Sequence, residues 1–147
     1  MQILFMVINI DVEDSYFVAF RTVVKETQEK HGFELPVDLE TYITFLLADR
    51  IDCVDIIPKH TFMESYLRIK DPKNAKDLGD TCLFLTGVFP EYGRRYGFTV
   101  DYYSSIGKDS YSNASYYLNR ELFFKLSKHF EFLRNFITLA TREKKQP

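Results

Sequence analysis

The chain has 147 residues, a length typical of a single domain that can bury a substantial core without disulfides or metals. Its net charge of −2 and isoelectric point near 5.9 argue against nucleic-acid binding driven by overall charge. The two cysteines, Cys53 and Cys82, lie far apart and lack the spacing of a metal or redox motif, which predicts reduced thiols and a cytoplasmic protein.

The first ten residues are almost entirely apolar. They are too few to span a bilayer, which takes about 20 residues, and they lack the basic start and small-residue cleavage site of a secretory signal. We expect a docked N-terminal segment, either extended or forming the first turns of a helix. The alternative is an exposed apolar arm that pairs with another subunit.

Beyond this segment, apolar residues recur at intervals of three and four, which predicts helices rather than strands. The first helix is predicted over residues 13–31 and is ended by a glycine. A second is predicted to begin near Pro36 and to end before Pro58. Thr61 can cap a short third helix that reaches Ile69.

The most apolar stretch of the chain lies near its middle. Asp71 and Pro72 predict the start of a helix there, because an acid and a proline both suit a first turn, and Pro90 predicts its end. Gly79 and Gly87 lie within it at helical spacing. We therefore expect a central helix that its neighbours approach unusually closely.

Residues 91–98 are predicted to form a loop. Thr99 can cap a fifth helix, and Asn119 a single last helix that reaches Ala140. This last helix carries two apolar stripes, of which the second comprises Phe132, Phe136 and Leu139. The predicted architecture is a single all-α domain over 1–147, an irregular or orthogonal bundle of about six helices. An extended segment over residues 2–8 is the one exception that the sequence allows.

One pattern links the central and fifth helices: Leu-Gly-Asp, an apolar run, Gly-x-Phe-Pro, Asp-Tyr-Tyr and a later glycine. The residues that carry it are Leu78, Gly79, Asp80, Gly87, Phe89, Pro90, Asp101, Tyr102, Tyr103, Gly107 and Tyr111. The pattern resembles that of an uncharacterised group of bacterial all-helical proteins. This resemblance implies an all-α bacterial protein and no particular catalytic or binding role.

Asp80 together with Asp101 is the best candidate for chemistry. A carboxylate in an apolar helix, as Asp80 is, needs a hydrogen-bond or ionic partner if it is buried. Arg94, Arg95 or a tyrosine hydroxyl could supply that partner. One interpretation is a polar clamp in which Asp80 and Asp101 tie the loop and the helix ends together. The other is a general base or metal ligand in a cleft. The candidate residues are Asp80, Glu91, Arg94, Arg95, Asp101 and Tyr103.

Two weaker patterns could hold a metal ion. Asp49, Asp52 and Asp55 recur every three residues, and His60 and Glu64 are one helical turn apart. The aspartates are more typical of residues that end a helix, and no established metal motif is present. The sequence therefore predicts neither a metal nor a cofactor, and it contains no nucleotide-binding loop or nucleophile motif.

Two classes of function remain. The favoured one is a helical interaction or regulatory module that forms a homodimer or binds another protein, with Tyr102, Tyr103, Tyr116 and Tyr117 as aromatic anchors. The alternative is a small enzyme or ligand-binding protein with a pocket near Asp80 and Asp101. The excess apolar surface equally suits a crowded bundle that buries it internally, and Arg94 with Arg95 suits local salt bridges better than nucleic acid.

Overall fold

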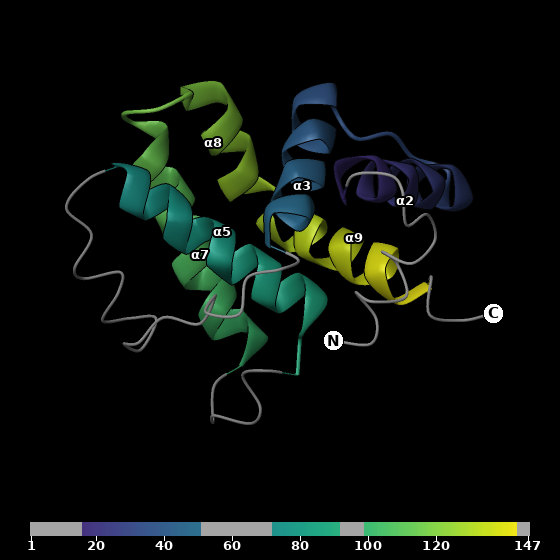
Figure 1. Cartoon of the computed structure of the whole chain (residues 1–147). Coiled ribbons are helices and arrows are strands. Elements are labelled where there is room, and N and C mark those ends of the chain that lie inside the picture. Colours follow the sequence, from purple (N-terminus) through teal and green to yellow (C-terminus); the bar gives the residue numbers. More distant parts are fainter. Residues whose placement is uncertain (1–15, 51–71, 92–98, 144–147) are drawn as a thin grey trace.

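The computed structural model describes residues 16–50, 72–91 and 99–143, and these contain helices and no strand (Figure 1). The all-α fold predicted from the sequence is therefore confirmed. The six helices of the described residues are α2 (Tyr16–His31), α3 (Val37–Arg50), α5 (Pro72–Val88), α7 (Val100–Ser115), α8 (Arg120–Lys128) and α9 (Phe130–Glu143). None of the described helices is long and apolar enough to cross a membrane.

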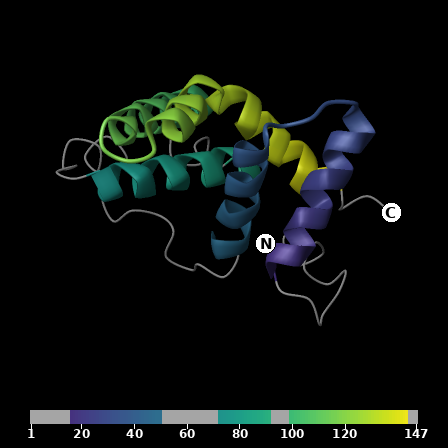
Figure 2. The same cartoon turned by 90° about the horizontal axis from the view of Figure 1, so that it is seen from above.

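Helix α5 is the centre of the bundle. Every residue from Leu78 to Val88 is buried, and α5 contacts α7, α9 and α3. Figures 1 and 2 show α5 beside α7, with α3 between α5 and α2, while α9 packs on α5 and also contacts α2. The nearly all-apolar sequence of α5 is explained by this position, because its neighbours cover it on several faces.

Glycines allow these helices to approach closely. A Cβ atom added at Gly79 would lie 2.8 Å from the ring of Tyr111, and one at Gly87 would lie 2.7 Å from Cγ2 of Ile137. At Gly107 of α7, an added Cβ would lie 2.5 Å from the ring of Phe130. Since such distances are shorter than van der Waals contact, the close packing inferred from the glycine spacing is confirmed.

The sequence-based prediction of a single last helix is wrong. The chain leaves the helical conformation at His129, where φ is −103° and ψ is 21°, so that α8 and α9 are separate helices. The break lets α8 pack on α7 while α9 packs on α5 and α2. Of the second apolar stripe, Phe136 is buried, whereas Phe132 and Leu139 stay partly exposed.

Several predicted helix ends are confirmed. Thr99 and Asn119 each cap a helix by accepting a hydrogen bond from a backbone N–H three residues on, at 3.0 and 3.1 Å. Gly32 ends α2 with a φ of 71°, a conformation that glycine adopts without steric cost. The predicted third helix near 61–69, the N-terminal segment and residues 92–98 lie outside the described residues.

Candidate functional site

Asp80 lies at the point where three helices meet. Its Oδ1 accepts hydrogen bonds from the Tyr42 hydroxyl of α3 at 2.5 Å and from the Tyr111 hydroxyl of α7 at 2.6 Å. Its Oδ2 accepts one from Nζ of Lys76, one turn earlier in α5, at 2.9 Å. Asp80 itself is only 4% exposed. We call these four residues the Asp80 cluster.

Aromatic packing fixes the geometry of the cluster. The ring of Tyr111 occupies the space left by the missing side chain of Gly79, which places its hydroxyl beside the next residue, Asp80. The ring of Phe123 packs against both tyrosines, with centroids 5.9 Å from Tyr42 and 6.0 Å from Tyr111. The two hydroxyls are thus held on one carboxylate oxygen by contacts from α3, α7 and α8.

The electrostatics of the cluster keep both phenols protonated. Burial raises the pKa of Tyr42 and of Tyr111, and the negative charge of Asp80 raises each further. The Lys76 ammonium lies 5.6 Å from the centre of the Tyr42 ring, within reach of a cation–π interaction. Asp80 therefore receives three donors, and both of its oxygens are engaged.

A cleft of about 810 Å³ adjoins the cluster between α3 and α5. The described residues that line it include Tyr42, Phe45, Arg50, Lys76, Asp80 and Thr81. Arg50 crosses from the end of α3 to donate from Nη1 to Oγ1 of Thr81 at 2.6 Å. The cleft has the size of a small-molecule site and mixes charged, aromatic and aliphatic groups.

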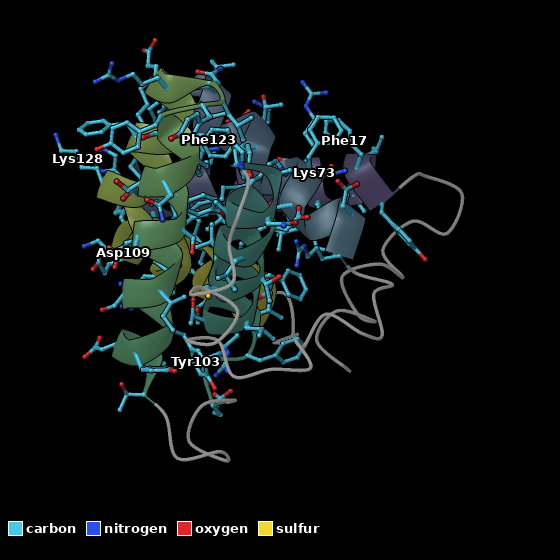
Figure 3. The ribbon with its side chains drawn as sticks, turned by 90° about the vertical axis from the view of Figure 1, so that its left-hand side faces the viewer. Phe17, Lys73, Tyr103, Asp109, Phe123 and Lys128 are labelled. Atoms are coloured by element: carbon cyan, nitrogen blue, oxygen red, sulfur yellow. The ribbon has the colours of Figure 1, made fainter. Side chains whose placement is uncertain are left out.

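The other residues predicted for this site lie elsewhere. Asp101 is exposed in the first turn of α7, ten residues before Tyr111 and thus about 15 Å away along the helix axis. Tyr103 is buried near the same end of α7, and Figure 3 shows it far below Phe123 of α8, which packs on the Asp80 cluster. Glu91 pairs with Arg142 of α9.

Arg94 and Arg95 lie outside the described residues. The partners of Asp80 that the structure does show are the tyrosine hydroxyls, one of the alternatives that the sequence left open, and Lys76. Lys76 could have been found from its i, i+4 spacing to Asp80. Tyr42 carries no such local signal, because only the packing of α3 on α5 brings it to the carboxylate.

Metal and thiol chemistry find no support in the described part of the chain. No group of three or more His, Cys, Asp or Glu residues there could hold a metal ion. Of the aspartates spaced three apart, Asp49 is on α3, whereas Asp52 and Asp55 lie outside the described residues, as do His60 and Glu64. Burial raises the pKa of the Cys82 thiol, which keeps it protonated and unreactive.

Exposed aromatic side chains occur in the turn between α7 and α8 and on α8 itself. Tyr116 is 69% exposed and Tyr117 75%, and Phe124 on the outer face of α8 is 58% exposed. Leu118 adds a further partly exposed apolar side chain. We call these four residues the aromatic patch. Of the other predicted anchors, Tyr103 is buried and Tyr102 half-buried.

Neither a protein-family model, nor a curated protein, nor a solved structure matches the chain. The resemblance to a bacterial helical group stays a prediction. Function is therefore inferred from the Asp80 cluster, the cleft and the aromatic patch alone.

Proposed function

We propose that this protein is a helical interaction module that self-associates through its aromatic patch. The observation that carries the proposal is the exposure of Tyr116 and Tyr117 in the α7–α8 turn and of Phe124 on α8, each more than half accessible. Burying large aromatic side chains contributes strongly to the binding energy of protein interfaces. Large apolar side chains that stay exposed at nearby positions in the chain are also candidates for contact with a partner.

The Asp80 cluster supports this proposal over an enzymatic one. A general base needs a free lone pair directed at a substrate, and a nucleophile needs an activating partner. Oδ1 of Asp80 accepts two hydrogen bonds and Oδ2 one, which leaves a single lone pair without a donor, and the raised pKa of each tyrosine disfavours a phenolate. The cluster is therefore better suited to joining α3, α5 and α7 than to catalysis.

Light scattering over a concentration series tests the proposal. We expect the wild-type mass to rise above that of the monomer, and the double variant Tyr117→Ser/Phe124→Ser to stay monomeric with an unchanged circular dichroism spectrum. Val37→Ser is the matched control, because Val37 is 79% exposed at the start of α3 and should not affect assembly. A wild-type protein that is monomeric at every concentration would contradict self-association.

A second candidate function, small-ligand binding, is favoured by the volume of the α3–α5 cleft. Thermal unfolding in the presence of a panel of small polar compounds would test it. A ligand of the cleft should raise the melting temperature of the wild-type protein. The variant Thr41→Trp should abolish that rise, because Thr41 is an exposed residue lining the cleft and a tryptophan there would occupy its space.

A further inference from the structure

The aromatic patch lies in a positively charged setting, although the whole chain has a net charge of −2. Helix α8 contains three cations and one anion. Its Lys125 is bound to Asp38 at 3.0 Å and to Glu121 at 3.3 Å. Arg120 and Lys128 are exposed, and neither forms an ion pair with another described residue.

These two cations flank the patch. Arg120 is four residues before Phe124 and Lys128 four residues after it, so all three lie on one face of α8. Asp109 of α7 is exposed on the same side of the molecule as Lys128, but the two form no ion pair (Figure 3). The surface around Phe124 therefore offers an aromatic contact with, at either end, a cation that pairs with no acid of the described residues.

This charge pattern disfavours two-fold pairing of the patch with itself. In an antiparallel pair of α8 helices centred on Phe124, Arg120 of one copy would face Lys128 of the other, and in a parallel pair each cation would face its own counterpart. Like charges placed opposite each other destabilise an interface. The aromatic patch is instead complementary to a partner surface that is both apolar and acidic.

The chain itself contains such a segment. Residues 3–10 are apolar apart from Asn9, and Asp11, Glu13 and Asp14 follow directly, all within a region outside the described residues. The segment precedes α2, and Figures 1 and 2 both show α2 on the side of the molecule opposite the α7–α8 turn. Because the proposed function is self-association, we assign the contact to two copies of the chain.

We propose that residues 3–14 of one copy bind the aromatic patch of a second copy. Their apolar side chains cover Tyr117 and Phe124, and their carboxylates lie beside Arg120 and Lys128. This inference rests on the proposed function and specifies its partner surface. Because the two surfaces differ, the contact is heterologous and builds rings or open chains, so the mass should exceed that of a dimer at high concentration.

A charge-swap experiment by light scattering tests the inference on the full chain. The variant Arg120→Glu/Lys128→Glu should raise the dissociation constant about tenfold, since two surface attractions become repulsions. The variant Asp11→Lys/Glu13→Lys/Asp14→Lys should weaken assembly likewise. Mixing the two variants should restore it, because each reversed patch then meets a segment of opposite charge.

The control is Arg21→Glu/Lys73→Glu, which reverses two exposed cations on α2 and α5 and should leave assembly unchanged. If Tyr117→Ser/Phe124→Ser disrupts assembly but the charge reversals do not, or if mixing fails to restore it, this inference is overturned while the proposed function stands. A wild-type protein that never associates overturns both.

Discussion

At the scale of single residues, Asp80 shows what a buried carboxylate requires. Its position in an apolar helix indicates the need for partners, and the structure supplies two phenols and an ammonium. The phenols come from helices that are distant in sequence, so the charge that is costly to bury also joins three elements. Removing it leaves Tyr111, which is fully buried, without its acceptor.

We therefore expect Asp80→Ala to lower the free energy of unfolding by about 1–3 kcal/mol, the cost of stranding buried hydrogen-bonding groups. Urea denaturation monitored by circular dichroism measures this. Asp77→Ala is the control, because Asp77 is exposed one turn earlier and its side chain should contribute less than about 0.5 kcal/mol. An Asp80→Ala protein as stable as the wild type would show that the cluster is not a structural clamp.

At the scale of helices, the glycines of α5 determine how closely its neighbours pack. Gly79 receives the ring of Tyr111 from α7, and Gly87 receives the side chain of Ile137 from α9. The backbone oxygen of Gly87 also accepts a hydrogen bond from Thr138 Oγ1 at 2.6 Å. The contacts of Tyr111 with Gly79 and of Ile137 with Gly87 depend on the absence of a Cβ atom. These two glycines therefore determine how closely α7 and α9 approach α5.

A large side chain at one of these positions should be poorly tolerated. We expect Gly87→Leu to destabilise the protein by about 3 kcal/mol or more, since the new side chain would meet Ile137 and would separate α9 from α5. The midpoint of thermal unfolding reports the effect. Ser105→Leu, an exposed position in the middle of α7, should leave the midpoint nearly unchanged. Equal midpoints for the two variants would contradict the close packing of α9 on Gly87.

At the scale of the whole molecule, α5 is the described helix with the largest share of buried residues. It packs mainly on α7 and α9 and also touches α3, whereas α2 packs on α3 and, to a lesser extent, on α9. An element buried on several faces opens only when the bundle unfolds, whereas one at the side can open locally. The molecule should therefore differ in stability from its centre to its α2 side.

Native-state hydrogen exchange measures this difference. We expect the amides of residues 78–88 to exchange slowest, with protection that corresponds to global unfolding, and the amides of α2 to exchange faster. Mass spectrometry of peptic fragments provides sufficient resolution. Exchange in α5 that is as fast as in α2 would contradict the central position of α5 in the folding unit.

The sequence by itself determined the elements that depend on local physics. Apolar spacing predicted the helices, side-chain acceptors at Thr99 and Asn119 predicted two starts, and Gly32 predicted one end. It also predicted that Asp80 would need partners, because the desolvation of a carboxylate depends on its immediate surroundings. The Asp80 cluster could be anticipated only to this extent.

Tertiary structure alone decided which helices meet and what they bring together. The break at His129 allows α8 and α9 to pack mainly on different helices. The spacing of apolar residues does not indicate such a break, because it continues through His129. Tyr42 and Tyr111 reach Asp80 because three helices cross there, while Asp101 lies at the far end of α7. Local sequence sets the conformation of each segment, but a site depends on contacts between residues far apart in the chain, and only packing sets those.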